Sequence, residues 1–328
     1  MPDTITILSL GAGVQSTALA LMAADGLIEM PVAAIFADTR DEPEEIYIHV
    51  ERLRGMVPFP VHVVREGGGL GADFLAALRG EKNRASQPPF YVRAPELTMD
   101  EIAAILAEPE PPHEEWEVNA INQESGDLVH LFDVKAKSSE WIEWSRRRRK
   151  ALNQDAGGML WRACTRDYKI APIRREIRKI MVAHGAKHAR SVIGISTDER
   201  QRENVSGVKF ITNVHPLLDM GWSRQKCEAW LKERHGMKIP KSACVYCPYR
   251  SNAGWARMKL EQPVEFERAC QFDEAIREAQ GKKMRGAGIT GQLFVHRSFT
   301  PLRTANFENM PGQLDFGFEQ ECDGMCGH

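Results

Sequence analysis

Apolar residues along this chain follow two patterns, short runs and helical stripes. Short runs bounded by turn residues predict buried strands at Ile5–Leu10, Pro31–Ala37, Val61–Val64 and Ser191–Ile195. Between the runs, apolar residues recur at helical spacing, as at Ile170, Ile173, Ile177 and Ile180. Strands that alternate with helices predict a doubly wound, mostly parallel α/β sheet. Any ligand of such a sheet is expected at the carboxyl ends of its strands.

The first apolar run leads through a glycine turn into a helix, and this order suits a phosphate site. Gly11 and Gly13 permit a tight turn and close approach of a ligand. The first N–H groups of the helix, with its dipole, favour an anion, and Ser16 and Thr17 add hydroxyl donors. The turn lacks the Gly-Lys-Ser/Thr ending of P-loop NTPases, and Ser16 replaces the third glycine of the dinucleotide motif. The alternative is a tight turn without a ligand.

Composition narrows the class of protein. The 328 residues are 43% hydrophobic, which is enough for a core, and the formal net charge of −2 means that any polyanion site must be a local patch. The absence of an apolar run of about 18 residues predicts no membrane span, and the start of the chain shows no signal peptide. We therefore expect a cytoplasmic protein with reduced thiols, whose seven cysteines, an odd number in clusters, favour metal over disulfides.

Polar residues follow two of the predicted strands. Asp38 and Thr39 come at the end of the second run, where they can contact a nucleotide, although Asp38 can also be only a helix N-cap. Arg200 and Arg202 lie in the loop after Ser191–Ile195, where they are either phosphate contacts or part of a solvated loop. The glycines Gly67–Gly69 form a flexible turn or a further phosphate contact.

The sequence pattern changes between residues 94 and 155, and we interpret this segment as an insertion in the core fold. Prolines at 109, 111 and 112 break any helix, and two apolar runs around Gly126 predict a hairpin. A helix follows that carries Trp141, Trp144 and the basic run Arg146–Lys150. Aromatic and cationic side chains together suit DNA or RNA, whereas a solvated helix face is the simpler alternative.

Five of the seven cysteines are candidates to bind a metal or to carry sulfur. Cys244 and Cys247 form a Cys-x-x-Cys pair that can hold one metal or cluster iron, with a redox dithiol as the rival interpretation. Cys164 directly precedes a basic helix, where the helix dipole favours a thiolate. Cys322 and Cys326 lie near the end of the chain, and one of them can supply a fourth ligand. Cys227 and Cys270 lie on apolar helix faces and are expected in the core.

The order of these motifs resembles the phosphoadenosine phosphosulfate reductase-like branch of the PP-loop ATP pyrophosphatase (adenine nucleotide α-hydrolase) superfamily. Residues 11–16 resemble its Ser-Gly-Gly-x-Asp-Ser loop, with departures at Gly11, Ala12 and Gln15. Asp38 and Thr39 followed by Glu42 look like the Asp-Thr-Gly-x-Glu segment of sulfonucleotide reductases. Residues 164–172 match Cys-x-Arg-x-x-Lys-x-x-Pro, but one cysteine of the family's pair is Ala163 here. Residues 321–322 and 326–328 echo the family's C-terminal Glu-Cys-Gly-Leu-His motif.

The resemblance implies a five-stranded or similar parallel sheet, a bound ATP or adenylyl nucleotide with Mg²⁺, and a [4Fe–4S] cluster, for which zinc is the alternative. The implied cluster ligands are Cys164, Cys244, Cys247 and Cys322, or Cys326 in place of Cys322. Cys322 and Cys326 are also the candidate catalytic thiols. The implied nucleotide contacts are Ser9, Gly11, Gly13, Gln15, Ser16, Thr17, Asp38, Thr39, Arg200 and Arg202. The expected division is a nucleotide-binding domain at 1–221 and a helical, cysteine-rich region at 222–328.

Three functions fit these residues. In the favoured one, an oxygen of DNA or tRNA is adenylated with pyrophosphate release and replaced by sulfur, as in DNA phosphorothioation or tRNA thiolation. A cysteine desulfurase or thiol carrier is then the expected partner, and no membrane is involved. In the second, a C-terminal thiolate attacks the sulfur of a small sulfonucleotide and sulfite is released. The third is a non-catalytic iron–sulfur protein that binds nucleic acid.

Overall fold

The structure is a computed structural model that describes residues 3–83, 86–93, 97–112, 114–121, 128–136, 138–152, 158–203, 205–279 and 291–308. Cys322 and Cys326 lie outside these residues. The chain divides into two compact units. The first contains residues 1–91, 159–289 and 293–328, and the second contains residues 92–158 and 290–292.

The first unit is built on a five-stranded sheet in the order β3-β2-β1-β8-β9, with every neighbouring pair parallel. This confirms the predicted α/β fold class. Strands β1 and β2 are buried along almost their whole length and carry the β-branched and small apolar residues that a sheet covered on both faces requires. The strands are β1 (Thr4–Ser9), β2 (Ala33–Asp38), β3 (Val61–Arg65), β8 (His188–Val192) and β9 (Ile211–Val214).

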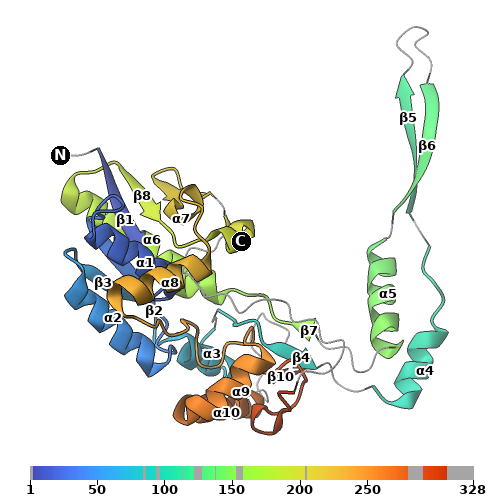
Figure 1. The fold of residues 1–328 in the computed structure, drawn as a ribbon. Helices are drawn as coiled ribbons and strands as arrows, with labels where there is room; N and C mark the ends of the chain where they lie inside the picture. Colours follow the sequence, from blue (N-terminus) through green and yellow to red (C-terminus); the bar gives the residue numbers. More distant parts are fainter. Residues whose placement is uncertain are drawn as a thin grey trace. The chain divides into compact units, whose positions relative to one another are not determined.

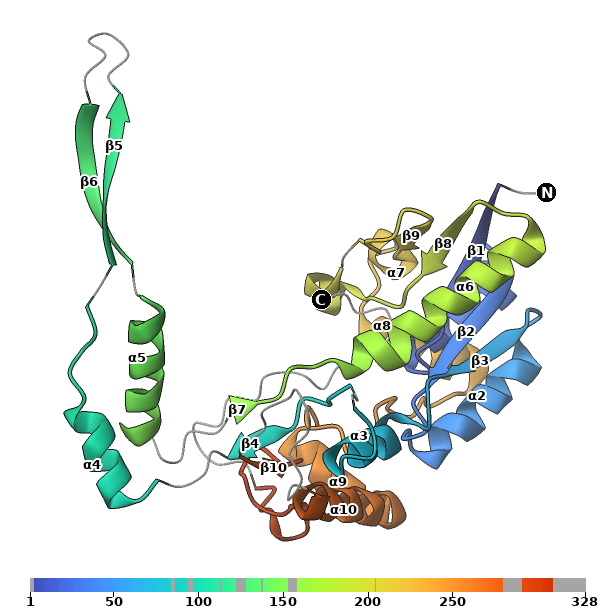
Figure 2. The ribbon, with the colours of Figure 1, turned by 180° about the vertical axis from the view of Figure 1, so that it is seen from behind.

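Helices cover both faces of this sheet. Figure 1 shows α1 (Val14–Ala24), α2 (Glu44–Met56) and α8 (Arg224–His235) on one face, where they enclose a core with Leu8, Phe36 and Val192. Figure 2, from behind, shows α6 (Ala171–His184) across the opposite face. Its predicted stripe of Ile173, Ile177 and Ile180 is buried against alternate residues of β1, β2 and β8.

The order in which the chain adds strands to the sheet changes direction at β1. The connection through α1 leads to β2 on one side of β1, whereas β8 pairs with the other side of β1. The loop after β1 therefore lies at a topological switch point, where parallel sheets bind their ligands.

The remaining elements of the first unit connect or extend this layer. They are α3 (Leu70–Leu78), the π-helix η1 (Thr165–Ile170) that runs into α6, the 3₁₀ helices η2 (Thr197–Arg202) and η4 (Leu302–Thr304), α7 (Pro216–Asp219), α9 (Asn252–Glu261) and α10 (Pro263–Glu278). Short strands β4 (Tyr91–Arg93), β7 (Gly158–Met159) and β10 (Gln292–Phe294) lie where the two units are joined in sequence. Ser223 caps α8, since its hydroxyl accepts the Lys226 N–H at 3.2 Å. Cys227 and Cys270 are buried, as expected.

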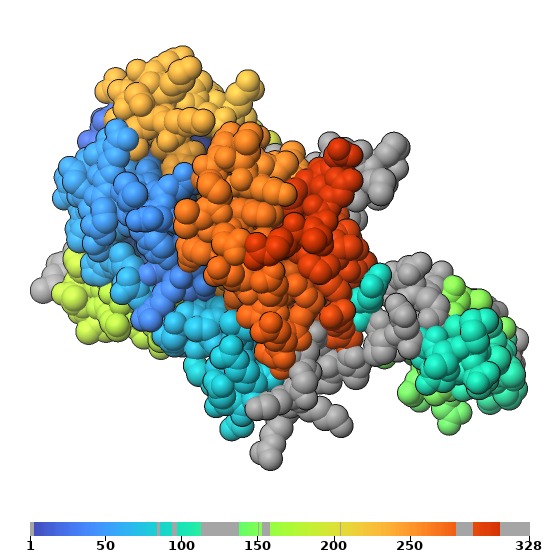
Figure 3. All heavy atoms as spheres, turned by 90° about the horizontal axis from the view of Figure 1, so that it is seen from below, coloured from blue at the N-terminus to red at the C-terminus, as the bar shows by residue number. Residues whose placement is uncertain are grey.

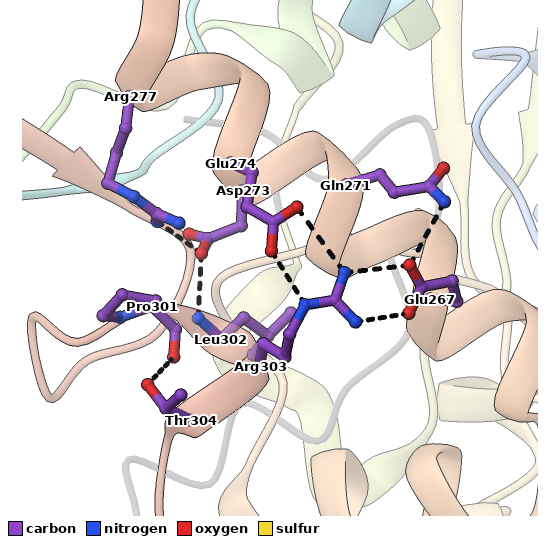
Figure 4. A network of polar contacts seen from close by, with 9 residues as sticks. All are labelled: Glu267, Gln271, Asp273, Glu274, Arg277, Pro301, Leu302, Arg303 and Thr304. Atoms are coloured by element: carbon purple, nitrogen blue, oxygen red, sulfur yellow. Dashed lines mark hydrogen bonds and ion pairs between the residues drawn. The ribbon is translucent and has the colours of Figure 1, made fainter.

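A polar network attaches the last described segment to α10 (Figure 4). The Arg303 guanidinium pairs with Glu267 and Glu274 at 2.7 and 2.8 Å. The buried Asp273 carboxylate accepts the backbone N–H groups of Val295 and Leu302, both at 2.8 Å. Figure 3 shows the two segments side by side, α10 in orange and the segment before residue 309 in red. The chain continues from this anchored segment toward Cys322 and Cys326.

The second unit contains the predicted hairpin, formed by β5 (Glu114–Ile121) and β6 (Leu128–Ala136), and two helices, α4 (Met99–Ala107) and α5 (Ser139–Leu152). Thr98 and Glu101 form a reciprocal capping box at the start of α4. None of the helices in the described part of the chain is long and apolar enough to cross a bilayer.

Candidate functional site at the carboxyl edge of the sheet

The turn after β1 is buried. Gly13 precedes α1 in an extended conformation, and Ala12 has a φ of +58°. The predicted contacts Ser9, Gln15, Ser16 and Thr17 are each at most 1% exposed. The start of a helix such as α1 favours an anion through its dipole and its first N–H groups, so an anion at this turn stays a prediction.

The side chains of this turn bond to neighbouring elements. The Gln15 amide donates to the Ser196 hydroxyl at 3.2 Å and accepts from the Arg224 guanidinium at 3.4 Å, which ties the turn to η2 and α8. The Thr17 hydroxyl lies 2.9 Å from Nε2 of the buried His49 on α2, and burial lowers the pKa of His49 to about 4. In this structure Gln15 and Thr17 therefore fix the shape of the turn, and their contact with a nucleotide stays a prediction.

The end of β8 approaches the same turn closely. A Cβ atom added at Gly194 would lie 2.8 Å from the backbone nitrogen of Ser16 and 3.0 Å from Cβ of Gln15. Only glycine allows this packing. The Ser9 hydroxyl, at the end of β1, is buried and has no hydrogen-bond partner within the described residues. A buried polar atom without a partner marks this edge as a place for a polar ligand.

The end of β2 is held by Asp38. Its carboxylate accepts from the Arg65 Nε at 2.7 Å, from the Tyr47 hydroxyl at 3.0 Å and from the Arg40 N–H at 2.7 Å. Burial and the Asp38 charge raise the pKa of Tyr47, so this phenol stays protonated. Asp38 thus orders the β2 loop, and it is not a helix N-cap, because the N-cap of α2 is Pro43.

A buried polar cluster joins this loop to distant segments. Lys169, on η1, lies 3.4 Å from the Glu42 carboxylate, and both side chains are at most 7% exposed. The Thr39 hydroxyl lies 3.4 Å from the Cys244 sulfur, and Cys244 lies 3.9 Å from Glu42. Burial, with the Glu42 charge, raises the pKa of Cys244 well above its ordinary value. Cys244 is therefore a protonated thiol at neutral pH in this structure.

The Cys244–Cys247 segment is fixed against both loops of the edge. The Ser242 hydroxyl donates to the Gly11 carbonyl in the first loop. In the second, the Asp41 carbonyl accepts the Val245 N–H at 2.8 Å, while the Asp41 carboxylate accepts the Gly71 N–H at 2.9 Å. Burial raises the pKa of Asp41. These bonds place the Cys244–Cys247 segment, which is distant from β1 in the sequence, at the switch point.

The two arginines predicted after β8 differ in their surroundings. Arg202 pairs with the buried Glu199 at 2.6 Å, which stabilises the turn of η2. Arg200 is exposed. Of the two, Arg200 is thus the more accessible to a phosphate.

The predicted metal ligands do not form a site by themselves. In the described ranges, no group of three or more histidine, cysteine or acidic residues is placed to hold a metal ion. Cys164, Cys244 and Cys247 are each of intermediate exposure. Because Cys322 and Cys326 lie outside those ranges, the cluster and its fourth ligand stay predictions.

The basic helix of the insertion uses several of its side chains to hold α4. The indole N–H of Trp144 donates to the Glu108 carbonyl at 3.2 Å, and Arg148 donates to the Leu106 carbonyl at 2.7 Å. Arg147 pairs with the Glu108 carboxylate at 2.8 Å. These contacts satisfy carbonyls at the end of α4. Arg146 remains exposed on α5, so nucleic-acid contact by this helix stays a prediction.

Several residues of the site were not among the predicted site residues. They are Asp41, Glu42, His49, Lys169, Gly194, Arg224 and Ser242. Glu42 and Lys169 fall at fixed positions of the motifs quoted above, and that placement was the available signal. The sequence carries no signal for the contacts of Asp41 or Ser242, because they depend on how distant segments meet.

Comparison with known proteins gives no family and one weak structural match. No protein-family model and no curated protein matches this sequence. Among solved structures, phosphoadenylyl-sulfate (PAPS) reductase from Candida auris, in a phosphate complex, matches with a TM-score of 0.34 and 13% sequence identity. The match covers 74% of this chain and 76% of that chain. A match at this level says nothing about the substrate of this protein.

Proposed function

We propose that the protein is an ATP-dependent sulfur-transfer enzyme that adenylates an oxygen of a nucleic acid and replaces it with sulfur. The observation that carries this proposal is the meeting of two segments at one edge of the sheet. The turn after β1, the predicted phosphate site, contacts Ser242, and the nearby Cys244 thiol contacts Thr39 directly after β2. A phosphate site and a thiol at the same switch point suit nucleotide-driven sulfur chemistry.

The reaction has two parts. First, the acceptor oxygen attacks the α-phosphorus of ATP, and the bond to pyrophosphate breaks. Second, a persulfide attacks the activated atom, and AMP leaves with the original oxygen. A second thiol then cleaves the sulfur–sulfur bond, so the acceptor keeps one sulfur and the two thiols leave as a disulfide. The persulfide comes from a cysteine desulfurase or a thiol carrier.

The protein's own residues position the nucleotide and its charge. Backbone N–H groups at the start of α1 face the phosphates and stabilise the negative charge that grows on their oxygens. Gln15 and Gly194 keep those donors in place through Ser196, Arg224 and close packing. Because the donors are fixed before the nucleotide binds, little reorganisation is needed during the reaction.

The test compares two substrates on the anaerobically purified protein. Labelled ATP is incubated with a single-stranded oligonucleotide and a persulfide donor, and in parallel PAPS or APS is incubated with a thiol. We expect pyrophosphate and a sulfur-containing oligonucleotide from the first reaction. Sulfite from the sulfonucleotide, without pyrophosphate from ATP, would establish the reductase instead. Binding of the oligonucleotide without binding of either nucleotide would indicate the non-catalytic protein.

The [4Fe–4S] cluster on Cys164, Cys244 and Cys247 is a separate proposal that needs a cysteine from outside the described residues. Its test is the iron and sulfide content of Cys322→Ser and Cys326→Ser, each compared with Cys227→Ser as a buried control. Loss of iron in only one terminal variant would assign the fourth ligand. Full iron content in both variants would show that neither terminal cysteine is a ligand. Zinc in place of iron would show that the bound metal is zinc.

A further inference from the structure

The basic side of α6 borders two open cavities that the proposed chemistry does not use. One, of about 590 Å³, lies between α6 and the segment before β9, and it is lined by Arg174, Arg178, Val182, Val208 and Phe210 among others. The other, of about 530 Å³, follows edge strand β3 on the opposite side of the helix. Arg175 and Lys179 line both cavities.

Positive charge is least compensated on the Phe210 side of the helix. Arg175 and Lys179 pair with the carboxylates of Glu66 and Glu176. By contrast, neither Arg174 nor Arg178 has a carboxylate partner in the part of the chain that the structure describes. The two arginines lie one helical turn apart, so their guanidinium groups can share one polyanion.

The floor of this cavity is apolar and fixed. The Arg178 guanidinium lies 4.7 Å from the centre of the Phe210 ring. The Phe210 carbonyl accepts the Ala189 N–H of β8 at 2.9 Å, and Arg174 donates to the Ser206 carbonyl. The segment that carries the ring is thus held to the sheet and to α6. An aromatic ring that lies beside one guanidinium group can stack a nucleobase, while two neighbouring arginines bind its phosphates.

We propose that this cavity binds a nucleotide unit of a single-stranded nucleic acid, with phosphates on Arg174 and Arg178 and a base against Phe210. Val182, 77% exposed at the rim, gives the sugar or a second base an apolar contact. The cavity on the other side of α6 ends at Arg65, which pairs with Asp38 at the carboxyl edge of the sheet. A strand bound to α6 therefore lies within the same unit as the candidate site.

This inference rests on the proposed function for the identity of the acceptor. The binding itself can be measured without ATP. The experiment uses a labelled single-stranded oligonucleotide and fluorescence anisotropy at several salt concentrations. The variant is Arg174→Ser/Arg178→Ser in the full chain, and the matched control is Lys238→Ser/Arg257→Ser, which removes two exposed cations elsewhere. Both pairs are also tested after Arg146–Arg149 are replaced by serine, so that any contribution of α5 is separated.

We expect the α6 variant to bind at least about tenfold more weakly, with a salt slope lower by about two, whereas the control changes little. Phe210→Leu should weaken binding by about fivefold or more and leave the salt slope unchanged. Equal losses in variant and control would overturn the proposal, as would full competition by a free mononucleotide or no oligonucleotide binding at all. Calorimetry with ATP on the same variants separates this outcome from failure of the nucleotide site.

Discussion

The carboxyl edge of the sheet and the α4–α5 pair of the insertion are both rich in polar and charged side chains, but they are built differently. At the edge, Thr39 and Glu42 are at most 1% exposed, and each contacts a partner far away in the sequence. In α4 no residue is buried, and Trp144 and Arg148 of α5 bond to carbonyls near the end of α4.

The polar groups at the edge are therefore preorganised, whereas those of the α4–α5 pair lie near the surface. Buried polar groups at the edge have fixed partners, so removal of one partner leaves an unsatisfied group in a medium of low dielectric. The insertion keeps its polar groups near water, where replacement costs little beyond the local contact. Large effects of single substitutions are therefore expected at the edge and small ones in α5.

The largest effect should come from Lys169→Met. It leaves the fully buried Glu42 carboxylate without its cation, and loss of one partner of a buried pair costs about 3–5 kcal/mol. Chemical denaturation of the single variant, of Glu42→Gln and of the double variant measures the coupling. The double variant should recover much of the loss. Equal free energies of unfolding for wild type and Lys169→Met would mean that the pair contributes nothing and that the edge resembles the insertion.

Gly194→Ala should have the second largest effect. The added methyl group would lie 2.8 Å from the Ser16 nitrogen, so the turn after β1 must move. Overpacking of this kind costs about 1–3 kcal/mol, and ATP affinity should fall with it because the donors of α1 shift. Calorimetry with ATP and denaturation check both effects. Gly55→Ala, in α2 with open space around it, is the control and should stabilise the protein by about 0.5–1 kcal/mol.

The same contrast explains how far the sequence could predict this molecule. Strands β1, β2 and β3 and the stripe of α6 follow from apolar periodicity, which depends only on local residues. The strand expected at Ser191–Ile195 is shifted to His188–Val192, and β9 was not among the predicted strands. The location of the candidate site at the carboxyl edge follows from the order of strands and turns. Pairings such as Lys169 with Glu42, 127 positions away, depend on how distant segments pack, and no local pattern encodes them.

Side-chain direction was the least predictable property. The composition of α5 suggested a nucleic-acid surface, yet Trp144 and Arg148 turn toward α4, because carbonyls at a helix end need donors. Thr17 was expected to face a nucleotide, but its hydroxyl contacts His49. In both cases a nearby unsatisfied group in the fold competes with the ligand for the same side chain.

Trp144→Phe should have a smaller, local effect. It removes the indole N–H that bonds the Glu108 carbonyl at 3.2 Å and keeps an aromatic ring beside Trp141. Loss of one hydrogen bond costs about 1 kcal/mol. Hydrogen exchange should show faster exchange of the α4 and α5 amides and no change in β1. Arg146→Ala, an exposed position on the same helix, is the control. Faster exchange of β1 amides in either variant would contradict the independence of the two regions.

The smallest effect, of opposite sign, is expected at Arg40, where the β2 loop departs from the Asp-Thr-Gly-x-Glu pattern. Arg40 has a φ of +66°, a conformation that favours glycine, and its side chain makes a long hydrogen bond to the Gly68 carbonyl at 3.5 Å. Arg40→Gly should therefore stabilise the protein by about 0.5–1 kcal/mol, since the relief of strain exceeds the added entropy of the unfolded chain. Arg40→Ala keeps the strain and removes the same side chain, so its free energy of unfolding should stay within about 0.5 kcal/mol of wild type. If both variants gained equally, the cause would be the arginine side chain, and the strained backbone of this edge would carry no cost.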